Sequence, residues 1–189
     1  MTADARRQQI LDTAHAIITA EGFHAATPNR IADAAGINRS LLYQQFGDPA
    51  GLFIALIDRE AARAAAQFAQ AVGGAVDENP ALRAFDTVLE AVDAHPATWR
   101  LFLFPPQGAP PELYERLAHA QAVVREYFVT KLLQFDPEMQ DPEYTARVLQ
   151  AASRELLQLR LTEPETATRE RLRAMARRLG SELLPRARS

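Results

Sequence analysis

Apolar residues recur along most of the chain at the spacing of amphipathic helices. Ile10, Leu11, Ala14, Ile17 and Ile18 follow i, i+1, i+4, i+7 and i+8, so they lie on one face of a helix. No run alternates β-branched or aromatic residues with polar ones, as a half-buried strand requires. The pattern predicts an all-α chain of about nine helices. We expect them at about residues 4–20, 28–35, 39–45, 49–71, 80–94, 96–104, 111–134, 142–161 and 165–183.

Residue pairs that cap helices mark the starts of the second and fourth predicted helices. Thr27-Pro28 and Asp48-Pro49 each place a capping side chain before a proline at the first helical position. Between the second and third predicted helices, residues 36–38 begin with glycine and end with asparagine, a good N-cap. Two short helices therefore flank a tight turn, which is the plan of a helix-turn-helix motif.

Composition limits the chemistry that the chain can perform. It contains no cysteine, which excludes disulfides, thiolate nucleophiles and metal sites made of cysteine. Its amino terminus is polar and charged, unlike a signal peptide, and no apolar run approaches the ~20 residues that span a bilayer. We therefore expect a cytoplasmic protein without a membrane partner.

Bulk charge gives no support for nucleic-acid binding. The formal net charge of the whole chain is -3 at pH 7. The first 47 residues hold four arginines and four acidic residues, which cancel. Any prediction of DNA binding must therefore rest on particular residues and their geometry.

Residues 6–57 resemble the DNA-binding domain of the TetR (tetracycline repressor) family. The matching features are Ile10-Leu11, Gly22-Phe23, Thr27, Ile31-Ala32, Ala35-Gly36-Ile37, Leu42-Tyr43, Phe46 and Leu52. The resemblance implies a three-helix DNA-binding domain at residues 1–47 and an all-helical ligand-sensing and dimerisation domain at residues 48–189. It further implies a homodimeric repressor that binds palindromic double-stranded DNA and is released by a ligand.

The third predicted helix carries a polar face suited to the major groove. Arg39 can reach guanine or a phosphate, Gln44 can pair with adenine, and Leu41 can touch a thymine methyl group. The resemblance implies a phosphate contact for Tyr43. Further contacts, mostly to the DNA backbone, are expected from Arg6, Arg7, Thr27, Asn29, Arg30, Ser40 and Gln45.

The start of the fourth predicted helix departs from the family pattern. Members of the family commonly have a phosphate-binding lysine there, whereas this chain has Asp48-Pro49. Pro49 offers neither a cation nor an amide hydrogen, and each missing phosphate contact weakens binding and its salt dependence. We therefore expect moderate operator affinity that depends on two DNA-binding domains acting together.

The last two predicted helices carry an apolar stripe that is too wide for one neighbouring helix. The family resemblance implies that these helices form a four-helix bundle between two copies of the chain. The alternative is that the stripe belongs to the core of a single chain. The residues predicted to lie in the dimer interface are Leu149, Ala152, Leu156, Leu159, Leu172, Met175, Leu179 and Leu183.

Aromatic and apolar residues between the fifth and eighth predicted helices are candidates for a ligand pocket. A pocket with such walls and few polar groups suits a planar or lipophilic effector held by one or two hydrogen bonds. The alternative is ordinary core. The candidate residues are Phe85, Leu89, Trp99, Phe102, Leu103, Tyr114, Leu117, Gln121 and Phe128.

Two other classes of function compete with the regulator. The chain has no HExxH, Gly-rich phosphate loop or GxSxG motif, so we expect neither an enzyme nor a cofactor. Glu112, Glu115 and His119 approach the spacing of metal ligands, but a solvated acidic face explains them better. A helical adaptor protein without sequence-specific DNA binding is the second alternative, and it would leave the polar face around Tyr43 unexplained.

Overall fold

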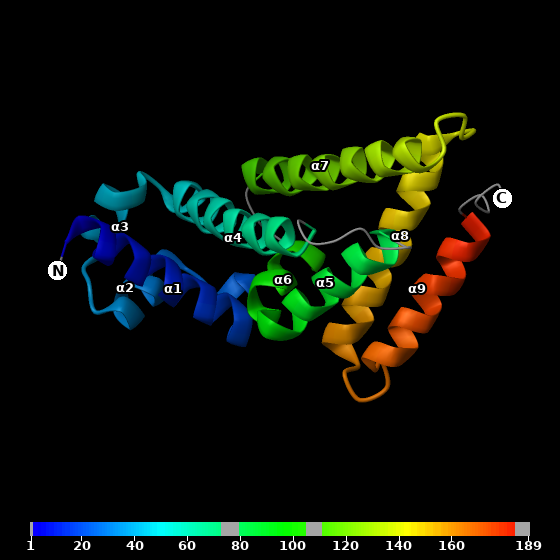
Figure 1. The fold of residues 1–189 in the computed structure, drawn as a ribbon. Helices are drawn as coiled ribbons and strands as arrows, with labels where there is room; N and C mark the ends of the chain where they lie inside the picture. The colour runs from blue at the N-terminus through cyan, green and yellow to red at the C-terminus, as the bar shows by residue number, and fades with distance from the viewer. Residues whose placement is uncertain (1, 73–79, 105–110, 184–189) are drawn as a thin grey trace. The chain divides into compact units, whose positions relative to one another are not determined.

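Helices make up the regular secondary structure of the residues that the structure describes. The computed structural model describes residues 2–72, 80–104 and 111–183, and leaves out the side chains of 68–72, 80, 81 and 183. No helix in these ranges is both long and apolar enough to cross a bilayer. The predicted all-α class is confirmed, and these ranges contain nine α-helices and a 3-10 turn, η1 (Figure 1). The elements are α1 (Ala3–Glu21), η1 (Phe23–Ala25), α2 (Pro28–Ala35), α3 (Arg39–Phe46), α4 (Pro49–Val72), α5 (Pro80–Ala94), α6 (Pro96–Leu103), α7 (Pro111–Phe135), α8 (Pro142–Thr162) and α9 (Arg169–Leu183).

The chain divides into two compact units that are not the two halves of the sequence. The first unit consists of Met1–Arg63 together with Ala97–Ala118, and thus joins α1 to α3 with α6. The second unit consists of Ala64–Pro96 and His119–Ser189, and contains α5, α8 and α9. The predicted DNA-binding residues all lie in the first unit.

Local capping fixes the helix-turn-helix. The Thr27 side chain accepts a hydrogen bond from the amide of Arg30 at 3.2 Å, with proline at the first position of α2. Gly36 ends α2 in the left-handed conformation, with φ 64°. Asn38 Oδ1 then accepts from the amide of Leu41 at 2.7 Å and starts α3. These contacts are the ones that the sequence predicts.

The turn from α3 to α4 requires glycine at two positions for different reasons. Gly47 has φ 80°, a conformation that residues with a Cβ rarely adopt. Gly51 donates its amide hydrogen to Asp48 Oδ1 at 2.7 Å. A Cβ at Gly51 would collide with the carbonyl oxygen of Phe46. The end of α3 is therefore held close to the first turn of α4.

The core of the first unit lies beneath the helix-turn-helix. Helix α1 packs against α2 and η1, and α2 packs against α3. The rings of Phe23 and Phe53 lie 4.5 Å apart and join η1 to α4. A short helix such as α3 has little stability alone, so this core is what holds it in place. Its buried residues are Ile10, Leu11, Ala14, Ile17, Ala26, Ile31, Leu42, Leu52, Phe53, Leu56, Ile57, Leu101, Leu113 and Leu117.

In the second unit, α5 and α8 each pack against α9 and also against each other. A carboxylate at the end of α5 joins all three helices. Asp93 accepts from Arg160 Nε at 2.7 Å and from Arg169 Nε at 2.5 Å. Partial burial alone would raise the pKa of Asp93, but the two arginine hydrogen bonds outweigh it and hold the pKa below its ordinary value.

Helix α9 begins later than the sequence pattern predicts. The expected start is residue 165, whereas the helix starts at Arg169. The amide of Ala167 bonds to the carbonyl of Glu163 at 2.8 Å, and Ala167 is buried in the turn. Thr168 then accepts from the amide of Arg171 at 3.4 Å and caps the helix. Threonine therefore sets the start, since its side chain satisfies an otherwise free amide.

Candidate nucleic-acid interface

Helix α3 presents the predicted polar face to solvent. Arg39, Ser40 and Gln44 are exposed, whereas Leu42 is fully buried in the core of the first unit. Leu41 and Tyr43 are half-buried beside that face. Gln45, the next residue along, is also half-buried, so the structure brings six of the predicted DNA-binding residues together on one short helix.

Arg39 and Tyr43 form a joined pair on this face. The guanidinium group donates to the phenolic oxygen from Nε at 2.8 Å and from Nη2 at 2.5 Å. The same group lies 5.1 Å from the centre of the tyrosine ring. These contacts hold the phenol in one orientation, and its hydroxyl hydrogen still has the capacity to donate to a phosphate.

Arg7 contacts the end of α3. Its Nη1 donates to the carbonyl oxygen of Gln45 at 2.6 Å, and its guanidinium lies 4.3 Å from the centre of the Phe46 ring. Arg6, by contrast, donates to Gln9 Oε1 on its own helix at 2.9 Å. Arg7 therefore joins α1 to α3. The sequence analysis predicted a DNA contact for Arg7 and did not predict this structural role.

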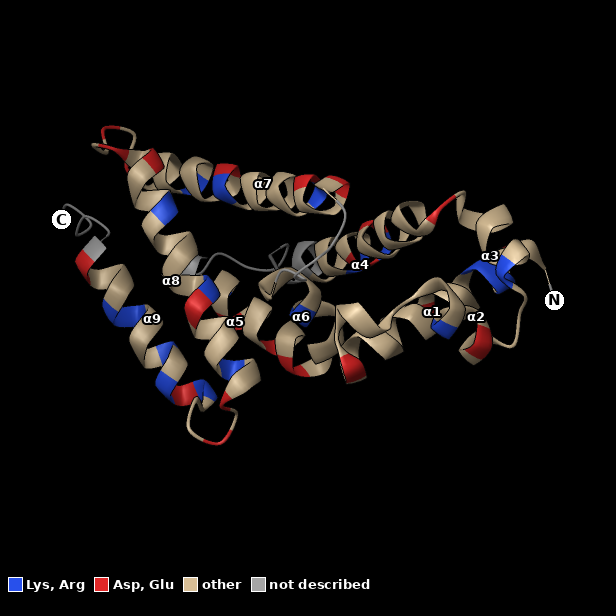
Figure 2. Cartoon of the chain, turned by 180° about the vertical axis from the view of Figure 1, so that it is seen from behind, with Lys and Arg blue, Asp and Glu red and all other residues tan. Residues whose placement is uncertain are grey.

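The residues expected to contact DNA at the start of α2 are exposed. Thr27, Asn29 and Arg30 all face solvent. Arg30 Nη2 lies 2.8 Å from Glu21 Oε1, so its positive charge is paired. Figure 2 shows basic residues near α3 and the start of α1, with acidic residues close by on α1 and α2. Basic and acidic residues therefore lie close together in this domain, in agreement with the zero net charge of its sequence.

A buried carboxylate, Glu60 on α4, anchors this unit. It is 0% exposed and accepts from Thr98 Oγ1 on α6 at 2.6 Å. Its Oε1 lies 2.9 Å from nitrogens of Arg59 and Arg63, and 4.0 Å from His15 Nδ1 on α1. Burial alone would raise the pKa of Glu60. The Thr98 hydrogen bond and the neighbouring positive charges outweigh burial and hold the pKa below its ordinary value.

Sequence reasoning missed this anchor although a signal was present. Glu60 lies four and seven positions after Leu56 and Phe53, so it continues the apolar stripe of α4 at a core-facing position. A carboxylate in such a position needs buried partners. Arg59 extends the network to α1, because its Nη1 lies 2.8 Å from Asp12 Oδ1.

The predicted ligand residues are divided between the two units. In the first unit, Trp99 and Phe102 form an edge-on pair with ring centres 6.5 Å apart. Leu103 and Leu117 are buried there, and Tyr114 is exposed. The indole nitrogen of Trp99 is buried and has no acceptor among the described residues.

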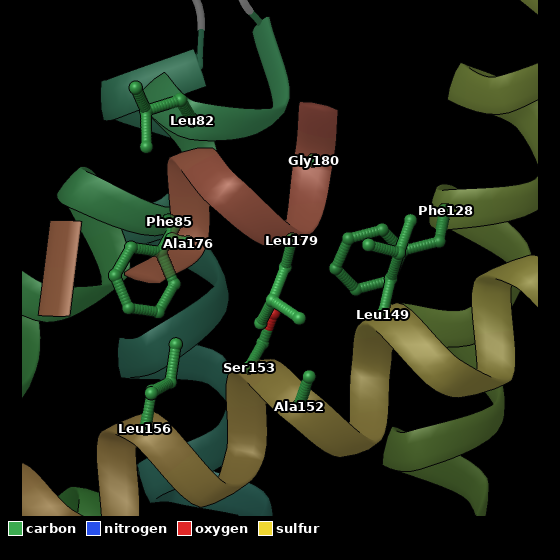
Figure 3. A pocket seen from close by; sticks show the side chains of 10 residues that line it. All are labelled: Leu82, Phe85, Phe128, Leu149, Ala152, Ser153, Leu156, Ala176, Leu179 and Gly180. Atoms are coloured by element: carbon green, nitrogen blue, oxygen red, sulfur yellow. The ribbon is translucent and has the colours of Figure 1, made fainter. Parts of the chain in front are cut away.

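In the second unit, an apolar cavity of about 40 Å³ lies between α5, α7, α8 and α9 (Figure 3). Phe85 and Phe128, both predicted ligand residues, line it, together with the hydroxyl-bearing Ser153. Leu89 is buried, and the carbonyl of Gln121 accepts from Gln150 Nε2 at 2.8 Å. Two of the predicted ligand residues thus lie on a cavity.

The predicted dimer residues have different environments. Leu156 and Leu172 are buried within their own unit, as the alternative of a single-chain core expects, and their place in a dimer interface stays a prediction. Met175 is exposed, and Leu159 is half-buried. Leu183 lies outside the described side chains. Leu149, Ala152 and Leu179 line the cavity of the second unit.

Other apolar side chains of α8 do face solvent. Tyr144 is 69% exposed and Val148 is 51% exposed, and they lie four positions apart on one face of the helix. The sequence stripe on α8 therefore has two sides, because Leu156 and Leu157 face inward while this pair faces outward. No group of three His, Cys, Asp or Glu side chains in the described parts of the chain could hold a metal ion.

Known proteins resemble both the amino-terminal domain and the whole fold. The family model for bacterial regulatory proteins of the tetR family matches residues 10–56. The transcriptional activator FasR of Mycolicibacterium smegmatis is 35% identical over 81 residues, covering 43% of this chain and 37% of that protein. The transcriptional repressor AcnR of Corynebacterium glutamicum is 39% identical over 59 residues, 31% of each chain. The chain thus spans about a third of the length of these curated relatives.

Two solved structures share the fold over nearly the full length. A TetR-like transcriptional regulator from Rhodococcus sp. RHA1 has a TM-score of 0.76 at 24% identity, covering 94% of this chain and 97% of that one. A putative transcriptional regulator from Pseudomonas aeruginosa has a TM-score of 0.79 at 18% identity, covering 97% and 92%. Together with the helix-turn-helix and the exposed face of α3, these matches confirm the resemblance read from the sequence. Residues 10–56 thus match the tetR family of bacterial regulatory proteins, and the chain as a whole shares the fold of TetR-like regulators.

Proposed function

We propose that this protein is a cytoplasmic transcriptional regulator that binds a palindromic operator as a homodimer and is released by a small apolar effector. The observation that carries the proposal is the exposed polar face of α3, where Arg39 holds Tyr43 in place. Residues 1–47 bind DNA, and residues 48–189 sense the effector and form the dimer.

Base recognition is assigned to α3. Gln44 and Ser40 are exposed on a helix short enough to enter a major groove end-on. Tyr43 donates to a phosphate and sets the register of the helix on the duplex. Arg7 does not enter the groove in this proposal, since it secures the end of α3 to α1.

Homodimerisation is proposed through α8 and α9. One short recognition helix reads only a few base pairs, and a two-fold dimer doubles the contacts. Tyr144, Val148 and Met175 supply exposed apolar surface on these helices. Tyr144 and Val148 lie on one face of α8, and exposed apolar patches are typical of a protein interface.

Effector binding is assigned to the cavity of the second unit. Its lining is almost wholly apolar, with Ser153 as a hydroxyl that can fix the orientation of a ligand. The cavity is small, so an effector must enlarge it by moving α5, α8 or α9. A ligand that favours the enlarged form shifts the population of DNA-binding forms, which is the requirement for release. We propose repression, as the name of the relative AcnR states for that protein. The relative FasR is named a transcriptional activator, so activation is the alternative to repression.

Selection from a pool of random DNA duplexes tests this proposal. The expected product is an inverted repeat whose half-sites lie about one helical turn, roughly 34 Å, apart. Gln44→Ala should relax base preference at one position of each half-site, with a loss of about 1–3 kcal/mol. A pool that gains no sequence preference would overturn the proposal and favour the helical adaptor.

A further inference from the structure

We propose that two copies of the chain cross at Ala151 of α8, so that Arg147 of each copy pairs with Glu155 of the other. This inference rests on the homodimer of the proposed function, and it goes further by naming where the two-fold axis lies and which charges meet across it. All three residues belong to the second unit and to one helix. The surface can therefore be described from α8 alone.

The outward face of α8 has no use within the chain. Leu156, Leu157 and Leu161 are buried on the opposite side of the helix, where they face the second unit. Within the part of the chain that the structure describes, neither Arg147 nor Glu155 has an ion-pair partner. The exposed residues of the outward face are Tyr144, Arg147, Val148, Ala151 and Glu155.

The charges on this face are complementary to a second copy of the same face. Arg147 lies four residues before Ala151 and Glu155 lies four residues after it, so the three share one side of the helix. The two charges are roughly 12 Å apart along the helix axis, and they do not pair within one copy. A two-fold axis through Ala151 makes the two α8 helices antiparallel and exchanges the two charged positions. Each guanidinium group then meets the carboxylate of the other copy, and both pairs form at once.

Ala151 suits the crossing point because of its size. The axes of packed helices lie about 8–10 Å apart, depending on the side chains at the contact. Ala151 has the smallest side chain of this exposed face, so a crossing there lets the two helices approach most closely. Val148 lies beside it and supplies apolar surface that the approach removes from water. An axis at Arg147 or at Glu155 would instead bring like charges together, which disfavours those registers.

Reciprocal charge exchanges test the pairing in the full-length protein. Arg147→Glu and Glu155→Arg should each raise the dissociation constant of the homodimer about tenfold, because like charges then meet twice. An equal mixture of the two variants should form a heterodimer with about the wild-type affinity, since both pairs attract again. Sedimentation velocity measures all three constants. Glu143→Arg, the same exchange in the first turn of α8, should stay within about twofold of wild type and should not rescue Arg147→Glu.

A single thiol locates the two-fold axis, because the chain has no cysteine of its own. On mild oxidation, Ala151→Cys should form a disulfide between two copies, since the Cα atoms at the crossing lie within the usual reach of about 4.4–6.8 Å. Ala174→Cys, the same exchange at an exposed position of α9, should not. A wild-type dimer whose affinity neither charge exchange changes, or which is crosslinked through Ala174→Cys and not through Ala151→Cys, would overturn this proposal and leave the homodimer standing. A monomeric wild-type protein would overturn both.

Discussion

At the scale of residues, the sequence predicts side chains whose partners are close along the chain. The caps Thr27 and Asn38 each bond to an amide three residues ahead, so local rules suffice to find them. The sequence did not predict the bond from Arg7 to the Gln45 carbonyl or the bond from Thr98 to Glu60, because each joins residues 38 positions apart along the chain. Only the folded arrangement shows that these two charged groups hold the unit together.

The first prediction concerns the hydroxyl group of Tyr43 and its contribution to operator binding. Tyr43→Phe removes the proposed phosphate donor and the acceptor for Arg39, while the ring stays packed. We expect operator affinity to fall about fivefold to tenfold, since one hydrogen bond contributes about 1 kcal/mol. Fluorescence anisotropy titration measures this. Tyr144→Phe on α8 is the matched control; it keeps the apolar ring of the proposed dimer surface and removes only a hydroxyl, so it should bind as wild type.

The second prediction compares the contributions of Arg7 and Arg6 to the stability of the fold. Arg7→Met removes the hydrogen bond to the end of α3 and the contact with Phe46. We expect the melting temperature to fall by about 2–8 °C, because the loss is about 1–2 kcal/mol in a chain of this size. Arg6→Met should melt close to wild type. A lower salt dependence of DNA binding with unchanged melting in Arg7→Met would show that Arg7 is a phosphate contact instead.

Glu60 predicts how stability depends on pH. Its pKa is lower in the folded protein than the ordinary value of 4.5, so folding favours the charged form. Its contribution is fully present above about pH 4.5 and is lost as the pH falls through the folded value. Glu60→Gln should therefore be less stable at pH 7 and should lose less stability on acidification. Urea unfolding at pH 7 and pH 4 measures both, with exposed Glu143→Gln as the control. A wild-type acid response retained in Glu60→Gln would contradict this role.

At the scale of elements, apolar periodicity and prolines predict where most helices lie. Contacts with other helices decide the boundaries that these local signals leave open. The seven helices from α2 to α8 begin at or next to a proline or an N-cap that the sequence displays, but α9 begins at Arg169, after its cap Thr168, and was placed too early. Ala167 is buried in the turn before α9, and this contact helps to set where the helix starts. The contact forms only when the second unit folds, so the sequence pattern does not reveal it. The α3–α4 turn, in contrast, is specified locally by glycine.

The start of α4 predicts a gain of DNA affinity. Pro49→Lys adds a cation and an amide hydrogen where the family pattern has a phosphate-binding lysine. We expect tighter binding to any duplex and a salt slope that is steeper by about 0.9. Gel-shift titrations at several salt concentrations measure both quantities. Pro142→Lys is the matched control, because Pro142 also opens a helix, α8, in the second unit, which contains none of the predicted DNA-binding residues. Equal slopes for the two variants would show that the start of α4 does not face the DNA backbone.

At the scale of the whole molecule, the family and the fold were predictable from the sequence, whereas the pockets were not. Residues such as Trp99 and Phe128 were grouped into one ligand site because both are aromatic on predicted inner faces. The structure assigns them to different compact units. Helical periodicity shows which face is apolar, but it does not show which helices share a core, and long-range contacts alone settle that.

The prediction for the whole molecule is that a charge on the exposed face of α8 prevents dimerisation. Val148→Asp places a charge on the exposed face of α8 without disturbing the core, since Val148 is 51% exposed. We expect a folded monomer by light scattering at micromolar concentration, with operator affinity reduced at least tenfold because one DNA-binding domain lacks its partner. Val123→Asp, the same exchange on an exposed position of α7, should remain dimeric. A monomeric wild-type protein would rule out the proposed assembly.

The most direct test of the central claim uses the lack of cysteine in this chain. Ser40→Cys places one reactive thiol on the exposed face of α3, where an iron chelate that cleaves DNA can be attached. If α3 enters the major groove in a two-fold dimer, the selected duplex is cut at two places about one helical turn apart. The same reagent on Ser181→Cys of α9 should leave the duplex intact. Cleavage by both variants alike, or by neither, would contradict the claim that α3 reads DNA.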